Sequence, residues 1–327
     1  MAVPLVDGFG RQVQDLRISV TDRCNFRCTY CMPKEGLHWL PRPDILSFEE
    51  IVRVARVFVE RFGITSVRLT GGEPTVRAHL PALVEQLAAL GVELSMTTNG
   101  ASLAGLAGPL RRAGLHRVTV SCDSLRPGRF AEITGRDMLG QVLAGIDAAV
   151  ASGLQPVKLN SVVVRGVNDD EVVDLARFGR ERGVEVRFIE FMPLDASGQW
   201  SAGKVVASAE VVARINEAYP LEPLTHGPEP AERFRYLDGA GTVGVVASVT
   251  RPFCASCDRV RLTAEGALRS CLFAVREADL RAILRGGGSD DDLAQAIADE
   301  VWHKWAGHSI GKVGFVRPPR SMSQIGG

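Results

Sequence analysis

The feature that most constrains the fold is a unit repeated through the first two-thirds of the chain: a short strand rich in β-branched residues, a loop and an amphipathic helix. The clearest helix is predicted at about 48–62, because Ser47 and Glu50 form a capping-box pair at its start. Alternating strands and helices predict a parallel sheet with right-handed crossovers. Its strands are predicted at 16–20, 66–70, 92–96, 117–121, 157–164 and 184–190.

An open sheet and a curved partial barrel could both be built from these units. Polar or cysteine-containing motifs follow the strands directly, at 24–31, 71–74, 97–100, 121–123 and 191–193. In a barrel such positions converge on one face, where active sites form. We therefore predict an α/β fold, a TIM-like partial (β/α)6 barrel over residues 1–193.

The pattern changes after Pro193. Helices are predicted at 208–219 and at about 290–305, and an antiparallel strand pair at 234–237 and 243–249. Residues 194–327 are thus expected to form an α+β extension that closes the barrel.

Charge and composition exclude several classes of partner. Lys and Arg together number 38, and Asp and Glu also number 38, so no nucleic-acid or membrane-surface partner is indicated. The first ten residues lack a secretion-signal pattern, and no apolar run is long enough to span a bilayer, so we expect a cytoplasmic protein. In that reducing compartment, seven cysteines favour metal or cluster ligation over disulfides.

Three cysteines follow the first predicted strand: Cys24, Cys28 and Cys31. Three thiolates can hold a four-iron cluster and leave one iron open for a substrate or cofactor. A zinc site that lacks its fourth ligand would use the same residues, and spacing alone leaves that alternative open.

A second triplet, Cys254, Cys257 and Cys271, lies in the extension. Its spacing fits a zinc knuckle and a second iron–sulfur cluster equally well. Arg259 and Arg261 follow on an extended segment, where alternate residues point to the same side. Arginine is well suited to binding phosphate oxygens, although a solvated basic strand edge would look the same.

The first triplet resembles the CxxxCxxC signature of the radical S-adenosylmethionine superfamily, in which an aromatic residue precedes the last cysteine; here it is Tyr30. A second superfamily element, Gly71-Gly72-Glu73-Pro74, follows the second predicted strand. The resemblance implies that this segment contacts the methionine part of S-adenosylmethionine. Glycine allows close backbone approach, and a carboxylate accepts from an ammonium group.

Over nearly its whole length the chain resembles the GTP 3′,8-cyclase family of molybdenum cofactor biosynthesis. This resemblance rests on the order of segments at 16–24, 67–74, 97–100, 118–121, 157–160, 187–192, 253–254 and 326–327. It implies two [4Fe-4S] clusters, S-adenosylmethionine, GTP as substrate, an external electron donor and a downstream enzyme that forms a cyclic pyranopterin. It is also compatible with a homodimer.

The resemblance further implies roles for individual residues. Those expected to contact S-adenosylmethionine are Tyr30, Gly72, Glu73, Ser121 and Met192. Those expected to contact GTP are Arg17, Arg68, Thr97, Lys158, Arg259 and Arg261. The second cluster would hold the guanine ring, and the expected catalytic set is Arg17, Arg259, Arg261, Gly326 and Gly327.

Simpler explanations exist for some of these residues. A structural ion pair would explain Lys158 equally well, and a terminal Gly-Gly is usually frayed. Cys122 stands where the family usually has an aliphatic residue, and we interpret it as a small buried apolar side chain, with a redox role as the alternative.

Two other functions fit parts of the sequence: a radical S-adenosylmethionine enzyme that modifies a peptide, and a non-catalytic metal-binding redox protein. The Arg259–Arg261 pair and the small number of cysteines in the extension argue against the first. The Gly-Gly-Glu-Pro segment argues against the second.

Overall fold

The computed structural model describes residues 2–32, 39–194, 198–225, 229–310, 315–318 and 320–326. Its strands form a 12-stranded sheet in the order β12-β11-β10-β1-β2-β3-β4-β5-β6-β9-β8-β7. The strands are β1 (Asp15–Ser19), β2 (Ser66–Thr70), β3 (Glu93–Thr98), β4 (Arg117–Ser121), β5 (Lys158–Val163), β6 (Glu185–Glu190), β7 (Leu221–Pro223), β8 (Glu232–Tyr236), β9 (Thr242–Val246), β10 (Arg259–Leu262), β11 (Ala267–Arg269) and β12 (Ala278–Asp279).

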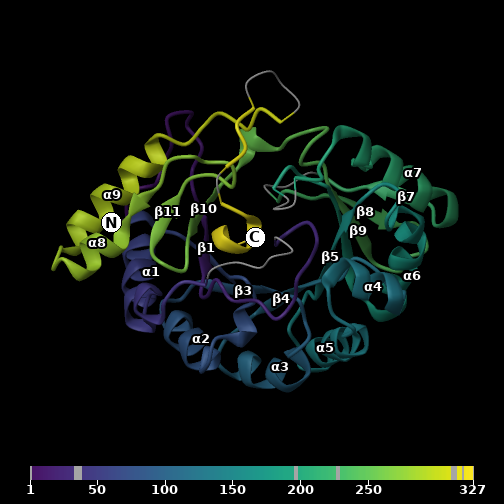
Figure 1. Cartoon of the computed structure of the whole chain (residues 1–327), viewed down its shortest axis with the longest axis horizontal. Coiled ribbons are helices and arrows are strands. Elements are labelled where there is room, and N and C mark those ends of the chain that lie inside the picture. Colours follow the sequence, from purple (N-terminus) through teal and green to yellow (C-terminus); the bar gives the residue numbers. More distant parts are fainter. Residues whose placement is uncertain are drawn as a thin grey trace.

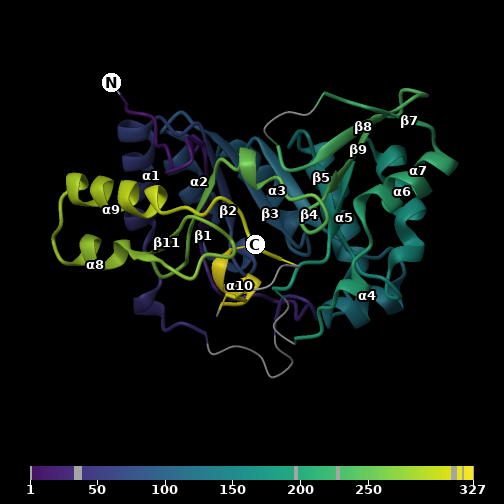
Figure 2. The ribbon, with the colours of Figure 1, turned by 90° about the horizontal axis from the view of Figure 1, so that it is seen from above.

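Helices surround the outer side of this curved sheet (Figure 1). Figure 2 places α8 and α9 at one end of the molecule and α6 and α7 at the other, while the short α10 lies inside the curve. The helices are α1 (Phe48–Phe62), α2 (Leu80–Ala88), α3 (Leu103–Arg112), α4 (Pro127–Thr134), α5 (Leu139–Ala151), α6 (Val172–Arg182), α7 (Ser208–Ala218), α8 (Leu280–Arg285), α9 (Asp290–Trp302) and α10 (Met322–Ile325).

The central strands, from β10 through β1–β6 to β9, pair in parallel throughout. All six strands predicted before residue 193 are present, and the predicted α/β class is confirmed. The extension continues the same sheet at both edges, since β10 pairs with β1 and β9 pairs with β6. Neither pairing follows from the pattern of residues in the sequence.

Side chains alternate along the central strands between the helix-covered side and the inner side of the curve. On β1, Leu16 and Ile18 are fully buried in the apolar core, while Arg17 between them points the other way. Val67 and Leu69 flank Arg68 in the same manner. The outer side therefore forms the core, and the inner side is left for polar residues.

Local sequence signals correctly predict where some helices and strands begin and end, but not all of them. The α1 capping box is confirmed: the amide of Glu50 donates to Ser47 Oγ (3.2 Å), and that of Ser47 donates to the Glu50 carboxylate (2.7 Å). The antiparallel pair β8–β9 is also confirmed, and α9 ends at Trp302, earlier than predicted. Asn168 precedes the short 3-10 turn Asp169–Glu171 without a side-chain cap, because its amide donates to the carbonyls of Asp123 and Val162.

Within the described part of the chain, no helix is long and apolar enough to cross a membrane.

Candidate active site

Three arginines from neighbouring strands form a row on the inner side of the sheet. Arg261 of β10 lies in register with Arg17 of β1, which lies in register with Arg68 of β2. Neighbouring strands are about 4.8 Å apart, and residues in register point to the same side. The three guanidinium groups are therefore crowded together, which the sequence could not show.

This arginine row is incompletely neutralised. Arg17 Nε lies 3.4 Å from an Asp15 oxygen, but Arg68 Nε is buried with no hydrogen-bond partner among the described residues. Burial, together with the charge of Arg17, lowers the pKa of Arg68 to about 10, and burial lowers the pKa of Arg261 well below its ordinary value. Buried cations are costly unless an anion compensates them, so the row is suited to a polyanionic ligand.

Two more cations lie on β5 and β6. Lys158 Nζ lies 3.5 Å from the Glu229 carboxylate, to which Arg187 also donates. Burial and the charge of Arg187 lower the pKa of Lys158 to about 8. The charge of Arg187 also reaches Arg68, so the two sets of cations lie within electrostatic range of each other. Arg187 was not predicted as a site residue, although it alternates with buried apolar residues as Arg17 does.

The other predicted contact residues lie along the same region. Thr97 of β3 is in register with Thr119 of β4, whose Oγ1 accepts from Arg68 Nη1 at 3.4 Å. Ser121 ends β4 on the same side as Thr119. Met192 packs against a small apolar cluster formed by Leu194, Phe273 and Ile310, next to Cys271.

The first cysteine triplet gathers in the loop after β1. Burial raises the pKa of the Cys28 thiol well above its ordinary value, and the charges of Cys31 and Cys24 raise it further. Burial also raises the pKa of Cys24 to about 11 and that of Cys31 to about 12. Thiolates held together away from water need a positive partner, and a bound metal centre would supply it.

Two distant segments reach this triplet. Asn99, after β3, hydrogen-bonds to the Cys24 thiol, and Ser323 of α10 hydrogen-bonds to the Cys31 thiol. Both contacts partly oppose the rise in the two pKa values. The chain terminus therefore lies directly against the first triplet.

The Gly-Gly-Glu-Pro segment packs on the loop that leads to Cys24. The amide of Gly72 donates to the Thr21 carbonyl (2.7 Å), and a Cβ at Gly72 would lie 2.5 Å from two backbone oxygens of that loop. The Glu73 carboxylate accepts from Thr75, from Thr98 Oγ1 and from the amide of Asn99. Glycine is thus required at position 72 for the close approach of these two loops, whether or not a ligand binds there.

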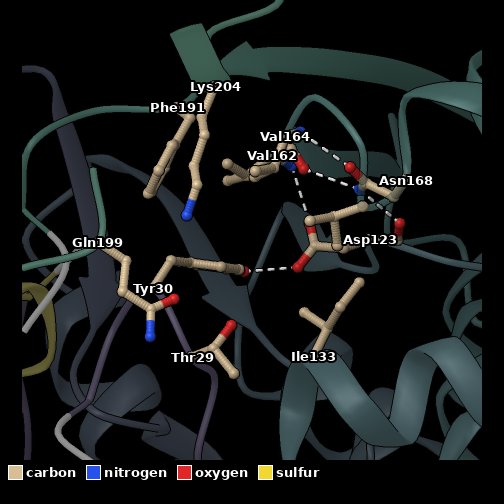
Figure 3. Close-up of a pocket in the computed structure, with 11 residues that line it drawn as sticks. Thr29, Tyr30, Asp123, Ile133, Val162, Val164, Asn168, Phe191, Gln199 and Lys204 are labelled. Carbon is tan, nitrogen blue, oxygen red and sulfur yellow. Dashed lines mark hydrogen bonds between the residues drawn. The ribbon is translucent and has the colours of Figure 1, made fainter. Parts of the chain in front are cut away.

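A pocket opens beside the first triplet (Figure 3). On one side Tyr30 Oη donates to Asp123 Oδ2 (2.6 Å), while Asp123 Oδ1 accepts from the amide of Val162 (2.8 Å). Burial raises the pKa of Asp123 to about 6. Phe191 and Lys204 enter from the opposite side. Asp123 and Lys204 were not predicted as site residues; the position of Asp123 after β4 was an available signal, whereas Lys204 had none.

The second triplet lies at the start of β10. Arg259 Nη2 donates to Cys257 Sγ at 3.3 Å. Burial raises the pKa of Cys257, but the charges of Arg259 and Lys304 outweigh this and lower it to about 7. The charges of Cys257 and Cys271 also reach Arg261, so the arginine row adjoins this triplet.

All seven cysteines are free of disulfides. No three His, Cys, Asp or Glu side chains of the described residues are arranged to hold a single metal ion. The assignment of the two triplets as ligands therefore stays a prediction. Cys122 is buried with a pKa raised by burial to about 12, as expected for an apolar core residue.

The C-terminal tail enters the inner side of the sheet. Gly326 has a φ of +71°, and its carbonyl accepts from Arg261 Nη1 at 3.2 Å. A Cβ at Gly326 would lie 2.6 Å from Thr70 Oγ1 and 3.0 Å from the Ser19 side chain. Gly327 lies outside the described residues.

Comparison with solved structures supports the fold. Streptococcus suis SuiB bound to S-adenosylmethionine aligns with a TM-score of 0.62 and 15% identity over 88% of this chain and 68% of SuiB. The structure of native anSMEcpe with bound AdoMet aligns with a TM-score of 0.59 and 16% identity, over 88% of this chain and 80% of that one. At such low identity, these alignments are evidence for a shared fold alone.

Two sequence-family models match consecutive parts of the chain. The Radical SAM superfamily matches residues 18–179, and the family Molybdenum Cofactor Synthesis C matches residues 184–310.

Full-length relatives are more specific. A GTP 3′,8-cyclase of Mycobacterium sp. (strain KMS) is 51% identical over 99% of this chain and 94% of its own length. Those of Mycolicibacterium smegmatis and Corynebacterium glutamicum are 49% and 47% identical, also over 99% of this chain, and over 92% and 89% of their own lengths. Identity at this level over nearly the whole chain shows that the protein belongs to the GTP 3′,8-cyclase family.

Proposed function

We propose that the protein is a radical S-adenosylmethionine enzyme that converts GTP to (8S)-3′,8-cyclo-7,8-dihydroguanosine 5′-triphosphate, the first step of molybdenum cofactor biosynthesis. The observation that carries the proposal is the arginine row formed by Arg261, Arg17 and Arg68, which adjoins the second cysteine triplet. A nucleoside triphosphate would supply the negative charge that the row lacks. The full-length relatives are GTP 3′,8-cyclases.

Each cysteine triplet would hold a [4Fe-4S] cluster with one open iron: Cys24, Cys28 and Cys31 the first, Cys254, Cys257 and Cys271 the second. The donor set fits, because each site offers three half-buried thiols within electrostatic range of one another. When bound, the first cluster and S-adenosylmethionine supply the electron and the organic radical for the reaction. The residues of this chain bind, orient and shield the reactants.

S-Adenosylmethionine would contact Tyr30, Gly72, Ser121 and Met192, next to the pocket of Figure 3. The hydrogen bond from Tyr30 to Asp123 fixes the ring at the edge of this pocket. Glu73 would hold the Gly72 loop in place instead of binding the ligand, because the Glu73 carboxylate already accepts hydrogen bonds from Thr75, Thr98 and Asn99.

GTP would be held at two ends. Lys158 and Arg187, with Arg68 and Thr97, face the space suited to the triphosphate, and Glu229 would give way to phosphate oxygens. Arg17 and Arg261 continue the arginine row from the triphosphate towards Arg259 and the second triplet, whose open iron would hold the guanine ring. Fixing both ends brings the ribose and the ring into reacting geometry.

The tail would complete the site. Gly326 lies against Arg261, and Ser323 lies against Cys31, so the terminus spans the space between the two triplets. There it would shield the reactants from water, with Gly327 as the last residue of the tail.

The same proposal covers the two parts of the chain, the cellular compartment and the partners of the enzyme. Residues 1–193 would form the partial (β/α)6 barrel, and residues 194–327 the extension with the second cluster. The enzyme would act in the cytoplasm, take electrons from an external donor and pass its product to an enzyme that forms a cyclic pyranopterin; the proposal is compatible with a homodimer. Support comes from the curved parallel sheet and the balanced charge.

The test is an anaerobic assay of the full chain reconstituted with iron and sulfide, supplied with dithionite, S-adenosylmethionine and GTP. We expect 5′-deoxyadenosine together with a cyclised nucleotide of the same mass as GTP, separated by chromatography. Arg68→Met should abolish the nucleotide product, whereas Arg61→Met, which removes an exposed arginine on α1, should not. Deoxyadenosine that forms regardless of GTP, without an altered nucleotide, would refute the substrate.

A further inference from the structure

Lys304, just after α9, is a buried cation that the proposed function does not use. Only 3% of its surface is exposed. Its Nζ donates to the backbone carbonyls of Cys257 and Arg259, both at 2.8 Å. It therefore ties the second-triplet loop to the first residue of β10.

Within the described part of the chain, Lys304 makes no ion pair with a carboxylate, unlike its cationic neighbours, although its charge reaches Asp258. Among the described residues its Nζ bonds only to the two carbonyls. The nearby arginines each have a carboxylate: Arg11 with Asp7 (2.6 Å), Arg17 with Asp15 (3.4 Å) and Arg259 with Asp258 (3.7 Å). An ammonium group buried in this way requires an anion close by.

The cysteines of the second triplet provide that anion. Burial lowers the pKa of Lys304, and the charges of Cys257 and Cys271 oppose this effect, so both thiolates lie within its electrostatic range. A four-iron cluster bound by three thiolates carries net negative charge, and one-electron reduction makes it more negative. A buried cation beside it would favour the reduced form.

We propose that Lys304 is the buried counter-cation of the second iron–sulfur cluster, holding the Cys257 loop in place and favouring the reduced cluster. The inference rests on the proposed function, because it requires the second triplet to hold such a cluster. Lys304 is a positioning residue: it contacts the backbone of a ligand loop and acts through charge and hydrogen bonds.

Arg11 offers a matched comparison on the other half of the same loop. Its Nη1 donates to the carbonyls of Cys254 (2.7 Å) and Ala306 (2.9 Å). Because Asp7 neutralises it within the fold, replacing both residues removes hydrogen bonds to the loop while leaving the net charge unchanged. Replacing Lys304 removes hydrogen bonds and charge together.

The experiment uses the full chain with Cys24, Cys28 and Cys31 replaced by Ala, so that only the second cluster is loaded. The midpoint potential of that cluster is measured by redox titration followed by electron paramagnetic resonance, with iron and sulfide quantified in each sample. Relative to this parent, Lys304→Met should shift the midpoint to more negative potential. Lys304→Arg, which keeps the charge, and the pair Asp7→Asn with Arg11→Gln should shift it less.

An unchanged midpoint in fully loaded Lys304→Met protein would overturn the inference. If Lys304→Met does not retain iron, the Lys304→Arg protein provides the test. Normal iron content with the midpoint potential of the parent supports the role of Lys304 as counter-cation. Loss of iron equal to that of Lys304→Met overturns it. Zinc in place of iron and sulfide in the parent would refute the second-cluster assignment itself, and metal analysis distinguishes that failure from a failure of Lys304.

Discussion

At the scale of single residues, the inner side of the sheet holds more cations than its carboxylates neutralise. Arg68, Arg261 and Lys158 all have pKa values lowered mainly by burial, which means that the fold disfavours their charged forms. A polyanion bound here would relieve the repulsion between these cations. If these side chains bind the substrate as proposed, substrate affinity and stability are coupled through them.

The coupling between GTP affinity and stability can be tested by changing the pH, because Lys158 titrates in an accessible range. Because its pKa in the folded protein is about 8, below the ordinary value of 10.5, its charge opposes folding. Its contribution to stability therefore falls as pH drops from about 10.5 to about 8 and levels off below that. Phosphate binding needs the charged form, so GTP affinity should fall as pH rises from 7 to 9, by up to about tenfold per unit above pH 8. Isothermal titration calorimetry at a series of pH values measures this.

Lys158→Met supplies the comparison for that experiment. The variant should bind GTP more weakly at pH 7, and its affinity should change little between pH 7 and 9. The exposed Arg61→Met protein should keep the wild-type pH dependence. A Lys158→Met protein with the wild-type slope would show that another group governs the effect.

At the scale of elements, short segments with close backbone contacts set the position of the site. α10 is only four residues long, yet it contacts Cys31 through Ser323, and Gly326 directly after it contacts Arg261. Arg320, just before it, anchors the tail through ion pairs with Glu265 and Glu277. Isolated helices of this length are not stable, so these tertiary contacts hold it.

Gly326→Ala should expel the tail. A Cβ there would lie 2.6 Å from Thr70 Oγ1, and a φ of +71° is itself strained for alanine, by about 1 kcal/mol. We expect at least tenfold less cyclised nucleotide and faster hydrogen exchange at 322–326. Gly287→Ala is the control, since its φ is +79° but nothing lies within 4 Å. Equal effects of both changes would mean that the close contact is unimportant.

At the scale of the whole molecule, the first 193 residues and the extension share one sheet. β10 covers the edge of β1 and β9 covers the edge of β6. The buried Glu190 carboxylate accepts from the amides of Ser208, Val249 and Thr250, which fastens the extension to the end of β6. Separating the two parts would expose two central strand edges and leave this carboxylate unpaired.

The full chain should therefore unfold in a single calorimetric transition, and residues 1–193 expressed alone should aggregate. Differential scanning calorimetry and gel filtration of both proteins test this. Two separate transitions in the full chain, with a soluble, folded fragment, would contradict the expectation. The same data test the predicted domain boundary at residue 193.

Most of the parallel sheet could be predicted from the sequence, because its signals are local. Short segments rich in β-branched residues marked the six strands, and the Ser47–Glu50 pair marked the start of α1. Arg187 and Asp123 carried local signals, the alternation along β6 and the position after β4, but these do not show which groups the two side chains meet. Lys204 was missed because nothing in its neighbouring residues shows that it faces the pocket.

The sequence by itself determined the strand–helix repeat, the spacing of the two cysteine triplets and the resemblance to one enzyme family. These depend on residues close together in the chain or on the order of motifs along it. Only the tertiary structure decided that Arg261, Arg17 and Arg68 stand side by side, and that Lys304 lies buried at the second triplet. Alternation specifies the face of a strand but not its neighbours, and strand pairing between residues more than 200 apart is set by packing of the whole chain.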